Sequence, residues 1–391
     1  MLPLILSLIL LAGSAPAAEK AFLESELIFP LEKKHNHSSM VVELPGGGLF
    51  TVWYRGSGER TADDVDIRFS RLDKGKKEWS APRVLADTPN FPDCNPTVFV
   101  DSKKRLWLLW PVIMANEWHT AIMKYSISSS FRNPAAPPRW EHSGIITFIP
   151  PNFAARTQDA LGPALAKAAP GSREERYLKN AIEKSKDKYF SRMGWMTRAH
   201  PVELPSGRII VPLYSDGYSF SIMGITDDGG MTWKASEPLV GFGAIQPAIA
   251  RGKDGTLTAY MRDNGPAPKR LHVSVSKDNG DTWSVPVDSD FPNPGSGSEV
   301  ITLRDGSWAL IYNDTEKGRH SLAVSISDDE GKSWKWKRHL ENKEGGSYHY
   351  PSLWEARDGS LHASYSYFVP EGKSIKHAHF DVDWVKQGNR P

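Results

Sequence analysis

Residues able to do chemistry recur at two kinds of position along this 391-residue chain, each beside a short apolar run. Arginine can hold a carboxylate through two parallel hydrogen bonds, and carboxyl groups can transfer protons. The positions just before a run carry His37, Asn95, Arg198, His200, Gln246, Glu299 and Tyr350. The positions after a run carry Arg55, Arg60, Asp63, Asp64, Arg262, Arg270 and Arg319. The combination suits an anionic ligand, provided that the fold brings the two sets together.

A repeated eight-residue motif indicates how these residues are positioned. Residues 226–233, 276–283 and 327–334 each read Ser/Thr-x-Asp-x-Gly-x-Thr/Ser-Trp, and their starts lie 50 and 51 residues apart. Asp and Ser/Thr side chains can bond backbone N–H groups in a turn, and glycine accepts a positive φ. We expect Asp227, Asp278 and Asp329 to be structural. Degenerate copies end at Trp79 and Trp140.

A second repeat, of predicted hairpins, alternates with the first. Apolar runs flank a glycine at five places and a lysine at a sixth: Gly48, Lys104, Gly207, Gly255, Gly306 and Gly359. The spacings are 56, 103, 48, 51 and 53 residues, so one gap is doubled. Residues 153–192 lie in that gap, are rich in Ala, Lys, Glu and Arg, and read as a helical insertion.

Six units of about 50 residues, each with four strands, predict an all-β fold, a six-bladed β-propeller over residues 27–382. The helical insertion falls in the second/third blade region. A strand near Leu27 would complete the last blade and close the ring. The alternatives are a seven-bladed ring and two β-sandwiches.

The propeller topology predicts where the polar residues meet. If the glycine turns and the Asp motifs share one face, the starts of the innermost strands and the loops after the second strands share the other. Both polar sets then converge on the axis of that face, where a pocket is expected. We expect the helical insertion to lie over or beside this face.

The N-terminal segment predicts export. The apolar run Leu2–Leu11 is too short to span a bilayer and precedes the small-residue pattern 15–17. We therefore expect a signal peptide over residues 1–17, cleavage near Ala17 and a secreted or periplasmic protein. Cys94 is the sole cysteine, which excludes an internal disulfide and a cysteine-cluster zinc site.

Composition narrows the set of partners. The chain has 48 Lys+Arg against 46 Asp+Glu, and this balance predicts no nucleic-acid or membrane-surface partner. The spacing of its histidines matches no metal motif, so we expect no metal and no cofactor. We expect a monomer.

The three Asp motifs, the six-unit spacing and the segments starting at Arg270 and Arg319 resemble the sialidase (neuraminidase) superfamily of BNR-repeat proteins, especially the bacterial sialidase-like exo-glycosidases. The resemblance covers roughly residues 35–382 apart from the insertion. It implies a glycoside hydrolase in which three arginines bind the substrate carboxylate. Arg270 matches the second of them and Arg319 the third.

The same resemblance implies catalytic roles. Tyr350 matches the family's tyrosine nucleophile, which is one of the exceptions to the two-carboxylate rule for glycosidases. The family's acid/base Asp falls at Asp63 or Asp64, with Glu59 in reserve. We predict that Tyr350 and one carboxylate of Asp63 and Asp64 face each other across the pocket.

The chain departs from the family pattern at two positions. The first arginine is missing, His35-Asn-His37 stands in its place, and Arg55 and Arg60 are the candidates to substitute for it. Gln246 replaces the glutamate that pairs with the tyrosine, and an amide cannot take up the phenolic proton. Glu299, one blade on, is the alternative acceptor.

Three functions stay open. The first is an exo-glycosidase acting on a terminal acidic sugar of a glycan. The second is a polysaccharide lyase on uronate-containing glycans, with Tyr350 or His200 as the base. The third is a non-catalytic glycan-binding propeller. The arginines as surface ion-pair residues, and Tyr350 as a packing residue, also remain alternatives.

Overall fold

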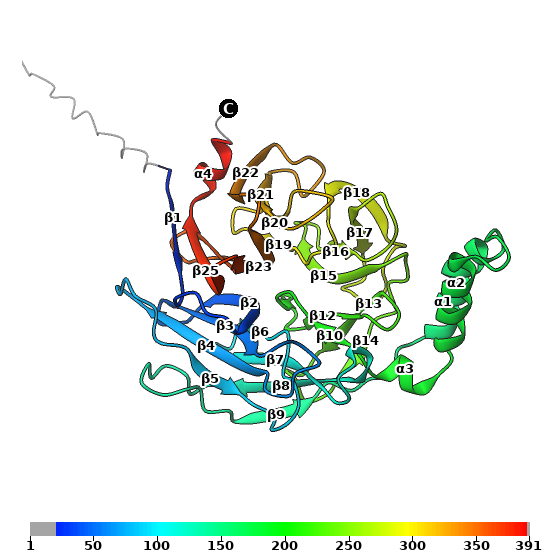
Figure 1. Cartoon of the computed structure of the whole chain (residues 1–391), viewed down its shortest axis with the longest axis horizontal. Helices are drawn as coiled ribbons and strands as arrows, with labels where there is room; N and C mark the ends of the chain where they lie inside the picture. The colour runs from blue at the N-terminus through cyan, green and yellow to red at the C-terminus, as the bar shows by residue number, and fades with distance from the viewer. Residues whose placement is uncertain (1–20, 389–391) are drawn as a thin grey trace, which may run out of the picture.

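Six blades, the third with five strands and the others with four, form a ring in the computed structural model, which describes residues 21–388 (Figure 1). The predicted signal peptide lies outside these residues. Blade 1 contains β2 (His35–Glu43), β3 (Gly48–Gly56), β4 (Asp66–Asp73) and β5 (Arg83–Ala86). Blade 2 contains β6 (Thr97–Val100), β7 (Leu106–Ile113), β8 (Ala121–Ser128) and β9 (His142–Ile145). The predicted six-bladed β-propeller is confirmed.

Blades 3 to 5 repeat the same meander. Blade 3 contains β10 (Met196–Thr197), β11 (Val202–Glu203), β12 (Ile209–Ser215), β13 (Phe220–Thr226) and β14 (Lys234–Ala235). Blade 4 contains β15 (Ala244–Arg251), β16 (Leu257–Asp263), β17 (Arg270–Ser276) and β18 (Val287–Pro292). Blade 5 contains β19 (Glu299–Thr302), β20 (Trp308–Asn313), β21 (Ser321–Ser327) and β22 (Trp336–Asn342).

Blade 6 closes the ring with strands from both ends of the described chain. It contains β23 (Ser347–Glu355), β24 (Leu361–Val369) and β25 (Gly372–Phe380), followed by helix α4 (Val382–Lys386). Its outer strand is β1 (Leu23–Leu27), which pairs antiparallel with β25. Because β1 comes from the start of the chain, blade 6 joins the two ends of the propeller.

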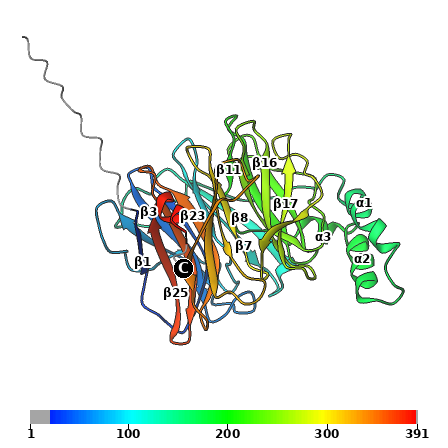
Figure 2. The same cartoon turned by 90° about the horizontal axis from the view of Figure 1, so that it is seen from above.

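Three short helices lie between blades 2 and 3 and project from the rim of the ring (Figures 1 and 2). They are α1 (Phe153–Leu165), α2 (Arg173–Lys184) and α3 (Lys188–Arg192), and a single turn of 3-10 helix, η1 (Trp118–Thr120), precedes β8. Leu161 and Leu178 are buried in one apolar cluster with strand residues of blades 2 and 3. Tyr177 donates a hydrogen bond to the carbonyl of Tyr218, in the β12–β13 turn, at 3.3 Å. The insertion therefore lies beside the loops that follow the second strands.

The Asp motifs are turns that pack against the preceding blade. In the first, Thr226 Oγ1 donates to Asp228 Oδ1 at 2.8 Å, and the Gly230 N–H donates to Thr226 Oγ1 at 2.9 Å. The turn carboxylate of this motif is Asp228, while Asp227 pairs with Arg208 and has a structural role outside the turn. Asp278 and Asp329 make the equivalent turns.

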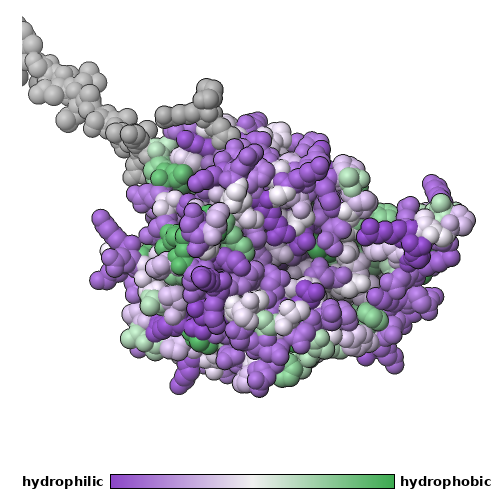
Figure 3. Space-filling model, in the orientation of Figure 1, coloured by the Kyte–Doolittle hydropathy of each residue, from purple (hydrophilic) through white to green (hydrophobic). Residues whose placement is uncertain are grey.

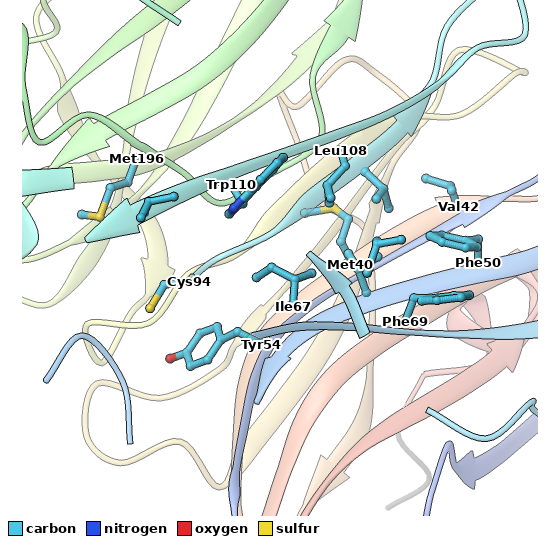
Figure 4. Packing of buried hydrophobic residues seen from close by; sticks show 14 of the residues in the cluster. Met40, Val42, Phe50, Tyr54, Ile67, Phe69, Cys94, Leu108, Trp110 and Met196 are labelled. Atoms are coloured by element: carbon cyan, nitrogen blue, oxygen red, sulfur yellow. The ribbon is translucent and has the colours of Figure 1, made fainter. Parts of the chain in front are cut away.

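The core fills the wedges between neighbouring blades. Figure 4 shows Met40, Val42, Phe50 and Phe69 of blade 1 facing Leu108 and Trp110 of blade 2. Each fully buried apolar side chain of this size contributes about 1.5–3 kcal/mol. Cys94 is buried in the same cluster. The packed wedges give the inner strands fixed positions around the axis.

Candidate functional site

The innermost strands are irregular where they start, and these irregularities aim side chains at the axis. Ser38, Asn95, Gln246 and Tyr350 have φ values of 57°, 39°, 55° and 45°, in the left-handed region that non-glycine residues rarely adopt. The strand register shifts beside three of them, in β2, β15 and β23. Bulges of this kind re-aim side chains near functional sites.

A pocket of about 400 Å³ opens on the axis. Five of the predicted residues line it: His37, Asn95, Arg262, Arg319 and Tyr350. The other lining residues are Tyr54, Glu59, Trp118, Tyr214, Asp216 and Asn264. Lining residues come from all of blades 1 to 6, so the ring assembles the site from segments that are far apart in sequence.

Tyr350 belongs to blade 6, but its oxygen contacts blade 4. Arg262 Nη1 donates to this oxygen at 2.9 Å, and Gln246 Nε2 donates at 3.0 Å. The ring of His37 stacks on the tyrosine ring, with centroids 4.4 Å apart. These contacts fix the phenol, and the two donors stabilise negative charge on its oxygen.

Three guanidinium groups surround Tyr350. Those of Arg198 and Arg319 lie 4.9 Å and 5.7 Å from the centroid of its ring, and Arg262 contacts its oxygen. Burial lowers the pKa of Arg198 and of Arg319. Burial also acts to lower the pKa of Arg262, but its interactions with Tyr350 and Asp216 outweigh burial, and this pKa is raised.

Two carboxyl groups in the pocket have opposite environments. Burial acts to raise the pKa of Glu59, but hydrogen bonds from His35 and Tyr54, together with Arg319, outweigh it and lower the pKa. Burial raises the pKa of Asp216, and this effect exceeds the opposing charges of Arg262 and Arg60. Such a pair suits one base and one acid.

His37 stays neutral over a wide pH range. Its pKa is lowered well below the usual value, first by burial and then by the charges of His349, His35, Arg319 and Arg198. Its Nδ1 lies 2.8 Å from Ser366 Oγ. Because the His37 ring that stacks on Tyr350 is neutral, the arginines are the cations that face a ligand.

The predicted carboxylates lie elsewhere. Asp63 accepts a hydrogen bond from Asn116, and Asp64 accepts hydrogen bonds from Ser57 and pairs with Lys34 on the surface. Neither lines the axial pocket, so the prediction that one of them faces Tyr350 is wrong. The residue held in reserve, Glu59, lies there instead.

Glu299 does not contact the tyrosine oxygen. It is 1% exposed and accepts hydrogen bonds from His200 and from the Leu353 N–H. It therefore ties three inner strands together beneath the pocket. His200 is held in the same contact and does not line the axial pocket.

Several predicted arginines also lie outside the pocket. Arg270 pairs with Glu316 at 2.5 Å, because its side chain starts one strand farther from the axis than that of Arg262. Arg55 pairs with Glu32, while Arg60 lies over the ring of Trp118 and near Glu117. Neither Arg55 nor Arg60 therefore substitutes for the first of the three arginines of the family pattern.

Sequence reasoning gave no role to Tyr54, Trp118, Tyr214, Asp216 and Asn264. A positional signal was present for all of them: Tyr54 and Tyr214 lie near the ends of the second strands of blades 1 and 3. The other three lie in loops that follow second strands. Within residues 21–388, no group of three or more His, Cys, Asp or Glu side chains is arranged to hold a metal ion.

The chain matches the BNR repeat-like domain family over residues 47–141 and 181–363. A sialidase from Bacteroides fragilis (strain YCH46) is 23% identical over 328 residues, which are 78% of this chain and 54% of the relative. The chain thus spans about half the length of this relative.

Solved structures share the fold at low sequence identity. A leech intramolecular trans-sialidase complexed with 2,7-anhydro-Neu5Ac superimposes with a TM-score of 0.68 at 14% identity, covering 93% of this chain and 71% of that chain. The intramolecular trans-sialidase from Ruminococcus gnavus, in complex with oseltamivir carboxylate, gives 0.66 at 14% identity, covering 92% of this chain and 96% of that chain.

Proposed function

The chain belongs to the BNR repeat-like family of sialidase-like propellers, and we propose that it is an exported exo-glycosidase that removes a terminal acidic sugar from a glycan. One observation carries the proposal: three arginines from blades 3, 4 and 5 surround one tyrosine on the axis. The apolar N-terminal run and the small-residue pattern up to Ala17 support export.

The arginines would bind the carboxylate of the sugar. Arg262 and Arg319 line the pocket, and Arg198 lies beneath the tyrosine ring. The Nε and Nη1 atoms of Arg198 and the Nε atom of Arg262 are buried and lack a hydrogen-bond partner within the described residues. A bound anion would offset the cost of burying these cations.

Tyr350 is the proposed nucleophile. Its oxygen would attack the anomeric carbon while the glycosidic bond breaks, giving a glycosyl–tyrosine intermediate joined through the phenolic oxygen, and the released glycan. The phenolic proton passes to water, because Gln246 is an amide and cannot take it. A neutral phenol avoids the repulsion that a carboxylate nucleophile would meet beside the anionic sugar.

The proton transfers fall to the two pocket carboxyls. Asp216, whose pKa is raised, would protonate the leaving oxygen. Glu59, whose pKa is lowered, would take a proton from the water that then attacks the anomeric carbon and releases the phenolate. Proton exchange with solvent returns Asp216 to the acid form, Glu59 to the carboxylate and Tyr350 to the phenol.

One observation favours a second candidate, a lyase on uronate-containing glycans. Among residues 21–388, no carboxylate accepts a hydrogen bond from Tyr350, and its oxygen accepts hydrogen bonds from Arg262 and Gln246. A phenolate stabilised in this way could abstract the proton beside a uronate carboxylate, with Arg319 neutralising that carboxylate.

Product analysis distinguishes the candidates. The protein is incubated with a panel of sialosides and uronate-containing polysaccharides. The proposal predicts a free acidic monosaccharide and no new absorbance near 232 nm. Unsaturated products absorbing near 232 nm would establish the lyase, whereas binding of a panel member without any product would establish a glycan-binding propeller.

A further inference from the structure

A second pocket, of about 570 Å³, adjoins the axial pocket where the insertion meets blades 3 and 4. Helix α2 contributes three side chains to it and the blade loops contribute the rest. Its main side chains are Arg173, Glu174, Tyr177, Ser219, Phe242 and Asn264. Asn264 lines both pockets, so the two are neighbours on the same face of the ring.

Asn264 forms the boundary between the pockets. Its Nδ2 donates to Ser219 Oγ at 3.1 Å, and its Oδ1 accepts from Arg262 Nη2 at 3.5 Å. Arg262 also donates to the Tyr350 oxygen. A chain of two side chains therefore connects the reactive oxygen to the second pocket.

The loop that carries Phe242 is held rigidly against the neighbouring loop. A Cβ on Gly243 would lie 2.1 Å from the Gly265 nitrogen, and a Cβ on Gly265 would lie 2.0 Å from the Phe242 carbonyl oxygen. Only glycine fits at such a close approach. The Asn264 N–H donates to the Gly243 carbonyl at 2.8 Å, which joins the two loops.

Helix α2 is anchored on the side away from the pocket opening. Ser172 caps its N-terminus by accepting from the Glu175 N–H at 3.0 Å, and Leu178 and Ile182 are buried. This anchoring leaves Arg173 and Glu174 exposed at the pocket, with Tyr177 half-buried between them and the blade.

The chemistry of the second pocket suits an uncharged sugar. Phe242, 39% exposed, and the ring of Tyr177 offer apolar surfaces for the C–H faces of a pyranose. Arg173, Glu174 and Asn264 offer donors and acceptors for hydroxyl groups. One cation and one anion balance each other, in contrast to the arginine-rich axial pocket.

We propose that the second pocket binds the neutral sugar next to the terminal acidic sugar, so that the helical insertion helps to select the glycan. This inference rests on the proposed function and adds a binding pocket for the part of the substrate that leaves. It makes the insertion part of substrate recognition.

Kinetics on two substrates test the inference. The 4-methylumbelliferyl glycoside of N-acetylneuraminic acid lacks a second sugar, and 3′-sialyllactose carries one. Phe242→Ala should lower the ratio of kcat/KM for 3′-sialyllactose to that for the aryl glycoside roughly tenfold, through KM, as expected for loss of one aromatic contact. Met231→Ala is the matched control, since Met231 is 67% exposed in the Asp turn of blade 3. An unchanged ratio in Phe242→Ala contradicts the inference.

Saturation-transfer NMR gives a readout that does not need turnover. With the Tyr350→Phe variant and 3′-sialyllactose, we expect saturation of the lactose protons, and its loss when Phe242→Ala is added. The inference is overturned if the lactose protons are not saturated, or if they are saturated equally in the Phe242→Ala variant. If the lactose protons are saturated and depend on Phe242, but the protons of the acidic sugar are not saturated, the second pocket is supported and the axial site for this acidic sugar is contradicted.

Discussion

Tyr350 draws its chemical character from side chains of four other blades. Arg198 of blade 3 lies under its ring, Arg262 of blade 4 contacts its oxygen, and His37 of blade 1 stacks on it. Arg319 of blade 5 also lies by the ring. A backbone with a positive φ at Tyr350 directs the side chain across the axis. The local sequence shows none of these contacts, because each partner comes from another repeat.

The arginines provide a matched comparison at the residue scale. We expect Arg262→Ala and Arg319→Ala each to weaken binding of an acidic sugar about tenfold to a hundredfold, since a charge-assisted hydrogen bond contributes about 1.5–3 kcal/mol. Arg270→Ala should change it less than about twofold, because Arg270 pairs with Glu316 outside the pocket. Titration calorimetry checks the affinities and circular dichroism the fold. Weaker binding in Arg270→Ala than in Arg262→Ala would mean that Arg270 binds the carboxylate of the sugar, as the sequence predicts.

The two pocket carboxyls should control opposite limbs of the pH profile. A base must be ionised and an acid must be protonated, so kcat should rise with pH through the pKa of Glu59, which acts in the second step, and kcat/KM should fall through that of Asp216, which acts in the first. We expect Glu59→Gln to remove the acidic limb and Asp216→Asn the alkaline limb, each with a rate loss of about a hundredfold or more.

Rate measurements from pH 4 to 9 on both variants provide the check. Asp63→Asn is the control, because Asp63 contacts Asn116 and not the pocket. A profile that is altered by Asp63→Asn and kept by both other variants would contradict the assignment.

At the scale of elements, the repeats could be predicted from sequence because their signals are local. The glycine turns and Asp motifs each lie within eight residues, and the strand expected near Leu27 is β1. The pocket could be predicted only in part. The bulges at Gln246 and Tyr350 and the ion pair of Arg270 with Glu316 depend on contacts between blades, which no repeat signal encodes.

Strand β1 should contribute measurably to stability. A chain that starts at residue 28 lacks β1, leaves the edge of β25 unpaired and loses the contact between Glu26 and Trp79. We expect its melting temperature to be at least about 5 °C below that of a chain starting at residue 21, because several backbone hydrogen bonds are lost. Differential scanning calorimetry of the two chains makes the comparison, and equal melting temperatures would show that ring closure does not need β1.

At the scale of the whole molecule, the ring is a rigid frame with a largely hydrophilic surface on the face seen in Figure 3. No helix within residues 21–388 has the length and apolar character needed to cross a membrane. The same frame recurs in solved structures at 14% identity. As a general rule, a fold by itself does not decide the reaction. Function follows from the side chains on the axis.

A buried carboxyl between blades 1 and 2 should make the stability of the ring depend on pH. Asp93 accepts hydrogen bonds from Thr88 and Trp110, but burial dominates and raises its pKa to about 6. Because the folded pKa exceeds the unfolded value, Asp93 stabilises the fold fully below about pH 4, and this contribution is lost as pH rises through 6.

Chemical denaturation of the wild type and Asp93→Asn at pH 4 and pH 7 tests this dependence. The free energy of unfolding of the wild type minus that of the variant should be larger at pH 4, by up to about 3 kcal/mol for a shift of about two pKa units. A difference that is larger at pH 7 would mean that the hydrogen bonds to Asp93 outweigh its burial.

The central claim is that Tyr350 attacks the anomeric carbon of a terminal acidic sugar. A 3-fluoro acidic glycosyl fluoride forms the glycosyl–enzyme and releases it slowly, so mass spectrometry of the digested protein can identify the labelled residue. We predict a single glycosyl adduct on the peptide that contains Tyr350 and no adduct in Tyr350→Phe, whose turnover should fall at least about a hundredfold. An adduct on Glu59 or Asp216, or full turnover by Tyr350→Phe, would contradict the account.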